Sequence, residues 1–133
     1  MKYEKSCGAV VLNGDTVLVV KHRAGHVDFP KGHVEGNETE EETAIREVKE
    51  ETNIDISIVG YRATIHYSPT PGVEKEVVFF LANRIGGKII PQLSEVTEVK
   101  WIPISEVEKT LTYHSAIDLF KEIVKRKEKE SEK

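Results

Sequence analysis

The stretch that decides the fold spans residues 32–54 and reads GHVEGNETEEETAIREVKEETNI. It begins with glycines and polar residues and continues with a helical pattern. Thr39 and Glu42 have the spacing of a capping box, and Asn53 stands where a left-handed residue ends a helix. The sequence therefore predicts a helix over residues 40–52.

The same stretch carries most of the charge imbalance of the protein. The 133 residues contain 23 acidic and 19 basic side chains, a formal net charge of −4. Residues 35–51 hold eight glutamates against Arg46 and Lys49, a net charge of −6, so the other 116 residues sum to +2. A near-neutral body with one acidic segment excludes binding of duplex nucleic acid through a broad basic face.

Three glutamates of the predicted helix share one edge, because residues three and four apart lie on the same side of a helix. They are Glu47, Glu50 and Glu51. The neighbouring arc, expected to pack on a sheet, is formed by Ala44, Ile45, Val48 and Thr52. Arg46 can reach Glu50 or Glu42 along the helix, but one guanidinium cannot neutralise all of these carboxylates.

Carboxylates this close raise one another's pKa unless a cation lies between them. Oxygen ligands without a nearby cysteine or paired histidines indicate Mg²⁺ or Mn²⁺ rather than zinc, and Mg²⁺ commonly keeps positions open for phosphate oxygens. Spacing alone leaves a second interpretation open, because glutamates at a helix start are also favoured by the helix dipole. Residues 40–42 fit that second interpretation.

The flanking sequence predicts strands at residues 6–12 and 16–21, joined by a turn at 13–15, and further strands at 56–67, 76–84 and 96–102. Helical spacing continues at 103–111 and 114–129, and the end of the chain after residue 125 is expected to be solvated and to fray. A long, irregular and basic loop is expected at residues 22–36. Helices on a mixed sheet predict an α+β fold, an α/β/α sandwich, in a single domain over residues 1–133.

Composition excludes other classes of protein. With 38% hydrophobic and 32% charged residues, the chain is too apolar for a disordered segment and too polar for a membrane protein. We expect no signal peptide, because the first residues are polar and no apolar segment follows them. The single cysteine, Cys7, cannot form an internal disulfide and is expected in the core, so a cytoplasmic location is expected.

The spacing from Gly32 through Glu38 to the run REVKEETNI at residues 46–54 resembles the Nudix box. This box is the signature of hydrolases that act on a nucleoside diphosphate linked to another group. The similarity extends over 23 residues with one departure, Asn53 where the family has glycine. Asparagine is the next best residue for a left-handed helix cap, so the predicted helix is retained.

The resemblance implies a role for each residue of the box. Glu50 and Glu51 would be the principal metal ligands, and Glu47 would be a ligand or the base that positions a water. The Gly32 carbonyl would be a further ligand. Arg46 would orient the glutamates by ion pairing, and Glu38 would support the junction between loop and helix or contact a residue that binds the metal. A base outside the box is also found in the family, and Glu95 is the first candidate, with Glu98 second.

The segment from residue 29 to residue 35, FPKGHVE, is similar to that of the bis(5′-nucleosyl)-tetraphosphatases, the diadenosine tetraphosphate hydrolases. This implies that Lys31 and His33 contact the polyphosphate, and Arg23 in the same basic segment is expected to join them. Tyr67 would stack on an adenine, with Phe79 or Phe80 as weaker candidates. Val27 departs from this group, which has a tryptophan near that position.

The implied reaction is hydrolysis of diadenosine tetraphosphate to ATP and AMP by in-line attack of a water, with Mg²⁺ or Mn²⁺ as cofactor. One alternative is pyrophosphohydrolysis of nucleoside triphosphates, oxidised nucleotides or a nucleotide sugar. Another is a catalytically silent domain that binds a nucleotide, although such a domain would be expected to lose Glu47, Glu50 or Glu51. The expected partner is a small-molecule nucleotide, without duplex nucleic acid or membrane, and the protein is expected to be a monomer or a homodimer.

Overall fold

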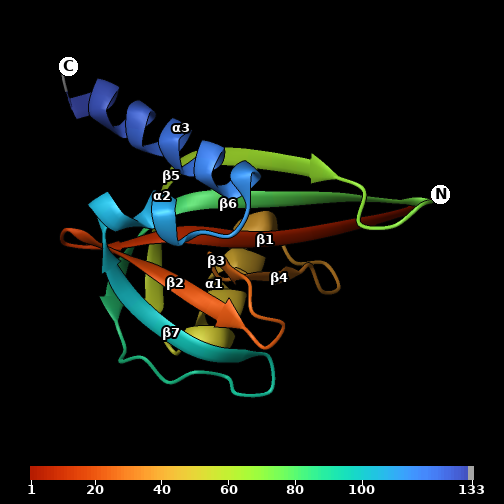
Figure 1. Ribbon diagram of the computed structural model, residues 1–133, viewed down its shortest axis with the longest axis horizontal. Helices are drawn as coiled ribbons and strands as arrows, with labels where there is room; N and C mark the ends of the chain where they lie inside the picture. Colours follow the sequence, from red (N-terminus) through yellow and green to blue (C-terminus); the bar gives the residue numbers. More distant parts are fainter. Residues whose placement is uncertain (132–133) are drawn as a thin grey trace.

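A mixed β-sheet of seven strands forms the middle of the computed structural model, which describes residues 1–131 (Figure 1). The elements follow the chain as β1 (Lys2–Asn13), β2 (Thr16–His22), β3 (Val27–Asp28), β4 (Lys31–His33), α1 (Glu40–Thr52), β5 (Asp55–Tyr67), β6 (Val73–Gly86), β7 (Val96–Pro103), the 3₁₀ turn η1 (Ile104–Glu106), α2 (Val107–Thr110) and α3 (His114–Ser131). The α+β fold with a sheet between helices is confirmed.

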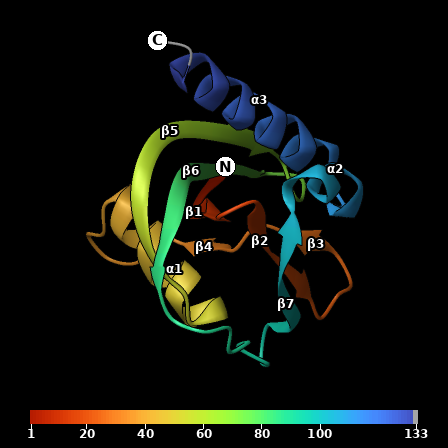
Figure 2. The ribbon, with the colours of Figure 1, turned by 90° about the vertical axis from the view of Figure 1, so that its left-hand side faces the viewer.

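The sheet has the order β3-β2-β1-β6-β5, with β4 also paired to β1 and β7 paired to β2. Strands β1 and β6 run parallel, from the Lys2–Val73 pair to the Leu12–Asn83 pair, and the other strand pairs are antiparallel. The predicted hairpin of β1 and β2 is present. Figure 2 shows α1 and α3 on opposite sides of this sheet.

Side chains of β1 alternate between two hydrophobic clusters, one on each face of the sheet. Val10 belongs to the cluster that contains Phe120 of α3, and Val11 belongs to the cluster that contains Val48 of α1. Because both faces are covered, the strand reads as an almost continuous apolar run. Cys7 is fully buried in β1, as expected of a small core residue.

Helix α1 begins and ends as the sequence predicts. The Thr39 hydroxyl accepts the backbone N–H of Glu42 at 3.1 Å, and the Glu42 carboxylate accepts the backbone N–H of Thr39 at 2.9 Å. Asn53 has a φ of 66° and donates its backbone N–H to the carbonyl of Lys49 at 2.8 Å. Both ends of the helix are therefore fixed by their own residues.

The buried face of α1 is narrower than expected. Ala44, Val48 and Thr52 are fully buried, whereas Ile45 is 42% exposed, so its assignment to the packed arc is wrong. Ile45 follows Ala44, and one residue turns a helix by about 100°, which carries this side chain off the sheet and into solvent.

Three other expectations need correction. The segment 22–36 is not irregular throughout, because it contains β3 paired with β2 and β4 paired with β1. The helix expected at 103–111 is instead η1 followed by α2, which ends at Thr110. The chain end expected to fray is helical through Ser131, with exposed side chains at 125–130 as expected, and residues 132–133 lie outside the described part.

Candidate functional site

Arg46 joins the carboxylates along one edge of α1. Its guanidinium donates to Glu38 through Nε at 2.6 Å, to Glu47 at 2.7 Å and to Glu50 at 3.2 Å. It also donates to the backbone carbonyl of His33 at 2.9 Å, which ties the helix to β4. The Arg46 guanidinium lowers the pKa of Glu38 to about 2. The ion pairing that the resemblance implies for Arg46 is present in the geometry.

Gly32 lies directly against Glu47. A Cβ atom at position 32 would overlap the Glu47 carboxyl group, so only glycine leaves room for this approach. Glu47 is 9% exposed, and burial raises its pKa despite the opposing contribution of Arg46. The backbone of β4 and the carboxylate of α1 therefore meet at one point of the site.

Glu51 is the most deeply buried of the acidic side chains, at 1% exposed. Its Oε2 accepts the backbone N–H of Lys31 at 3.3 Å, and it forms no ion pair within residues 1–131. Burial raises the pKa of Glu51 to about 8, with smaller contributions from the charges of Glu47 and Glu95 and an opposing contribution from the charge of Lys31. A buried carboxylate without a cationic partner is costly, and a bound cation would relieve that cost.

The loop between β6 and β7 brings Glu95 toward these carboxylates. Arg23 donates its Nε to the carbonyl of Leu93 at 2.6 Å and its backbone N–H to the carbonyl of Glu95 at 3.1 Å. The charge of Glu95 contributes to the raised pKa of both Glu47 and Glu51. Arg23 thus holds the loop rather than lining the pocket described below. Glu98, the second candidate, is exposed on β7 and pairs with Lys100 at 2.8 Å.

These donors fit a hard divalent cation, although no three carboxylate, imidazole or thiolate groups within residues 1–131 surround a common point. The donor set is oxygen only, as Mg²⁺ and Mn²⁺ prefer. Arg46 holds two of the carboxylates, whereas Glu51 is buried and forms no ion pair within residues 1–131. The charge of Lys31 only partly offsets the effect of this burial on the pKa of Glu51. Glu47, Glu50, Glu51 and the Gly32 carbonyl are therefore the groups that we expect to hold such a cation.

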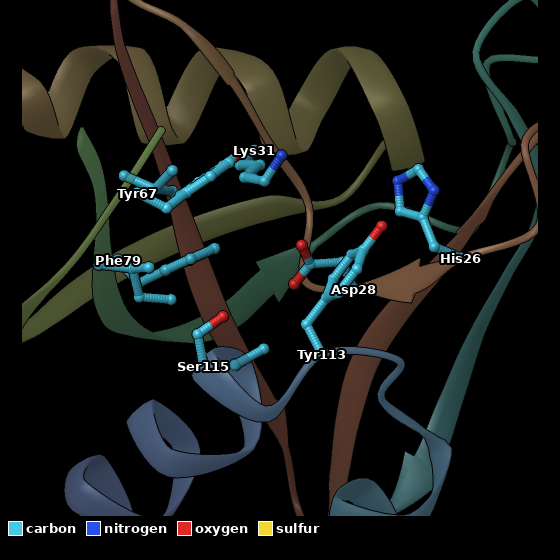
Figure 3. Close-up of a pocket in the computed structure, with 10 residues that line it drawn as sticks. His26, Asp28, Lys31, Tyr67, Phe79, Tyr113 and Ser115 are labelled. Carbon is cyan, nitrogen blue, oxygen red and sulfur yellow. The ribbon is translucent and has the colours of Figure 1, made fainter. Parts of the chain in front are cut away.

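A pocket of about 320 Å³ lies on the α3 side of the sheet, next to this acidic edge. Figure 3 shows Tyr67 and Phe79 on one side of it and His26 on the other. The residues that line it come from strands β3 to β6, from the start of α3 and from the segments just before β3 and α3: His26, Asp28, Lys31, Ile65, Tyr67, Val77, Phe79, Tyr113, Ser115 and Ala116. Its volume lies in the range of ligand pockets, roughly 300–1,000 Å³.

Lys31 connects the pocket to the acidic edge. Its side chain lines the pocket, while its backbone N–H donates to Glu51. Tyr67 lines the same pocket, as an aromatic wall requires. His33 does not line it, since its imidazole lies 3.8 Å from the Glu4 carboxylate and its side chain is 65% exposed. The structure thus brings Lys31 and Tyr67 together and leaves His33 outside the pocket.

Phe79 and Phe80 are neighbours on β6, so their side chains point to opposite faces of the sheet and only one of them can line the pocket. Phe79 lines the pocket, whereas Phe80 packs on the opposite face with the cluster that contains Ala44. Sequence reasoning missed four polar lining residues: His26, Asp28, Tyr113 and Ser115. No local pattern marks them, because two hydrogen bonds between Val27 and Thr112 bring Tyr113 beside β3 from 85 residues further along the chain.

No helix among residues 1–131 is both long and apolar enough to cross a membrane.

Comparison with known proteins gives consistent matches. The NUDIX domain model matches residues 2–122. The putative mutator protein MutT4 of Mycobacterium tuberculosis is 38% identical over 125 residues, which cover 84% of this chain and 50% of that protein. The 8-oxo-(d)GTP phosphatase of Mycolicibacterium smegmatis is 32% identical, covering 82% of this chain and 34% of that protein. The chain therefore spans half or less of the length of these relatives.

Solved structures show the same fold. The C. elegans Ap4A hydrolase binary complex superposes with a TM-score of 0.75 at 28% identity, covering 89% of this chain and 93% of that chain. A MutT NUDIX hydrolase from Burkholderia pseudomallei superposes with a TM-score of 0.76 at 21% identity, covering 90% and 97%. The second likeness concerns the fold alone.

Proposed function

Because the chain belongs to the Nudix family, we propose that it hydrolyses a phosphoanhydride bond in a nucleoside polyphosphate with a divalent cation as cofactor. The observation that carries the proposal is the position of Lys31. Its backbone N–H donates to the buried Glu51, which forms no ion pair within residues 1–131, and its side chain lines a pocket of nucleotide-binding size. A polyphosphate that extends from the pocket would pass the Lys31 ammonium and reach the acidic edge.

The residues of the acidic edge and the segments beside it would hold the cation, align its ligands, bind phosphate and accept a proton. Glu47, Glu50, Glu51 and the Gly32 carbonyl would hold Mg²⁺ or Mn²⁺, which when bound neutralises phosphate charge and makes phosphorus more open to attack. Arg46 keeps the carboxylates aligned through its hydrogen bonds. Lys31 binds phosphoryl oxygens, and Glu95 or Glu47 accepts the proton of the attacking water.

Within this class we propose diadenosine tetraphosphate as the substrate, cleaved to ATP and AMP. The aromatic side chains of Tyr67, Phe79 and Tyr113 around the pocket support a stacked purine base. The 28% identity to the C. elegans Ap4A hydrolase over nearly the whole chain supports the same choice. The position of His33 outside the pocket leaves Lys31 as the cation of that segment nearest the base.

Hydrolysis of a nucleoside triphosphate is the second candidate function. The observation in its favour is the name of a relative at 32% identity, an 8-oxo-(d)GTP phosphatase. Such a substrate carries one base, so the pocket beside Lys31 would hold it equally well. A nucleotide sugar is a further alternative in the same reaction class. The protein would act on these small molecules as a monomer or a homodimer.

The test is product analysis on a nucleotide panel with Mg²⁺, using wild type and Glu51→Gln. We expect ATP plus AMP from diadenosine tetraphosphate, faster than release from ordinary triphosphates, and loss of turnover in the variant. Glu41→Gln is the matched control, because Glu41 lies exposed at the start of α1 and is expected to leave turnover unchanged. Equal turnover in wild type and Glu51→Gln would refute the proposed mechanism, and preference for a triphosphate would select the second candidate.

A further inference from the structure

Asp28 is a buried carboxyl group in the pocket that the mechanism above does not use. It is 7% exposed, lies at the end of β3, and lines the pocket (Figure 3). Its charge acts on the pKa of Tyr67 across the pocket. A carboxyl group in a largely apolar pocket needs hydrogen-bond partners, and a bound ligand is one way to supply them.

The two oxygens of Asp28 differ in their surroundings. Oδ1 accepts the backbone N–H of Phe29 at 2.7 Å, which fixes the carboxyl group in place. Oδ2 has no hydrogen-bond partner within residues 1–131. The pocket therefore presents one oriented acceptor that is open to a ligand.

Around this acceptor the pocket is shaped for a flat ring. Phe79 and Tyr67 line one side, His26 and Tyr113 stand with ring centroids 5.6 Å apart, and the remaining lining is mostly aliphatic. Aromatic side chains stack on any purine, so they favour a base without selecting one. Selection among purines then depends on the polar atom that meets the edge of the base.

We propose that Asp28 determines base specificity, with Oδ2 accepting a hydrogen bond from the exocyclic amino group of adenine. Adenine presents an amino donor where hypoxanthine and guanine present a carbonyl oxygen, and a carbonyl oxygen facing Oδ2 is repelled. This inference rests on the proposed function, since it names the base that the nucleotide hydrolase accepts. Asp28 is a specificity residue and takes no part in phosphate cleavage.

Because the Phe29 amide fixes the orientation of the side chain at position 28, an asparagine there tests which hydrogen-bonding group faces the base. In Asp28→Asn, the side-chain carbonyl keeps the hydrogen bond from Phe29, and the amide NH₂ takes the place of Oδ2. An acceptor facing the base thereby becomes a donor. The variant is expected to prefer hypoxanthine, whose carbonyl accepts from that NH₂, whereas Asp28→Ala removes both interactions and is expected to discriminate little.

The experiment measures binding of AMP and IMP, and turnover of diadenosine and diinosine tetraphosphate with Mg²⁺. It is done at pH 8, because burial raises the pKa of Asp28 and the acceptor is the ionised form. Wild type is expected to favour adenine by about ten- to hundredfold, the size of one hydrogen bond to a charged group. Asp28→Asn is expected to reverse the ratio. Asp15→Asn, in the exposed turn between β1 and β2, is the matched control and is expected to leave the ratio unchanged.

The outcomes separate this inference from the proposed function. An AMP to IMP ratio that is unchanged in both Asp28 variants, each shown to be folded by thermal unfolding, overturns the role of Asp28. A wild-type preference for GMP over AMP also overturns it, because guanine presents a carbonyl oxygen where the proposal requires an amino donor to Oδ2. If the binding ratio reverses as expected while no nucleotide is hydrolysed, the base assignment stands and the proposed hydrolysis is wrong.

Discussion

Replacing Glu51 by glutamine is expected to stabilise the protein when divalent cations are removed. Glu51 is 1% exposed, and burial raises its pKa from 4.5 to about 8. Glutamine has nearly the same shape and retains an oxygen that can accept the backbone N–H of Lys31. The substitution therefore removes the cost of burying an ionisable carboxyl group and keeps the local hydrogen bond.

The size and sign of the effect follow from the two pKa values. Below pH 4.5 the Glu51 carboxyl is neutral in the folded and unfolded states, so it costs nothing. Between pH 4.5 and about 8 the unfolded chain ionises and the folded one does not, so the free energy of unfolding falls by about 1.4 kcal/mol per pH unit. At pH 7 the variant is expected to be more stable than wild type by about 3 kcal/mol.

Urea unfolding in EDTA at pH 5, 7 and 8 measures this difference directly. The matched control is Glu50→Gln, because the Glu50 side chain is 46% exposed and carries no such burial cost. Excess Mg²⁺ should reverse the order, because the cation stabilises the wild type and loses a ligand in Glu51→Gln. A Glu51→Gln protein that is no more stable than wild type at pH 7 to 8 in EDTA would refute the reasoning.

Three further predictions concern other parts of the protein. Gly32→Ala should displace the Glu47 carboxylate and lower both Mg²⁺ affinity and turnover at least tenfold. The control is Gly86→Ala, whose Cβ would contact its nearest neighbour at 3.4 Å and which should change neither quantity. Calorimetric Mg²⁺ titration measures the affinities. Arg46→Lys, which loses the planar fork, should lower kcat/KM by about ten- to hundredfold in steady-state kinetics. Burial lowers the pKa of His22 to about 4, so the contribution of this side chain to the free energy of unfolding should fall by about 1–2 kcal/mol as the pH drops from 6.5 to 4. In urea unfolding, His22→Phe should gain that much stability relative to wild type over this pH range.

The sequence predicts an element well where residues of that element determine its own ends. Helix α1 has its cap in Thr39 and Glu42 and its stop in Asn53, and its ends match the prediction. Strands β3 and β4 were missed because they are only two and three residues long and exist through pairing with β2 and β1. Ile45 was misassigned because a helical pattern shows which residues share a face, while the sheet decides how wide the buried face is.

In the candidate site, too, residues close together in the sequence were predicted, and residues brought together from distant segments were not. The carboxylates and Arg46 lie within one stretch of chain, so their spacing predicted that they would meet. The pocket is built from residues 26–31, two strands and the start of α3, and its Asp28 and Tyr113 carry no signal that single-residue patterns could show. His33 was assigned to the polyphosphate by resemblance, and its side chain instead faces Glu4. Whether it contacts a bound substrate stays a prediction.

The sheet separates the acidic helix from most of the pocket, since α1 packs on one face and the start of α3 lines the pocket on the other. A graft of residues 111–117 from another protein of this fold would exchange Tyr113 and Ser115 without touching any residue of α1. Base preference and hydrolytic chemistry are thus separable by protein engineering. Lys31 belongs both to the pocket, through its side chain, and to the acidic edge, through its backbone N–H. The segment around Lys31 therefore cannot be exchanged without affecting hydrolysis.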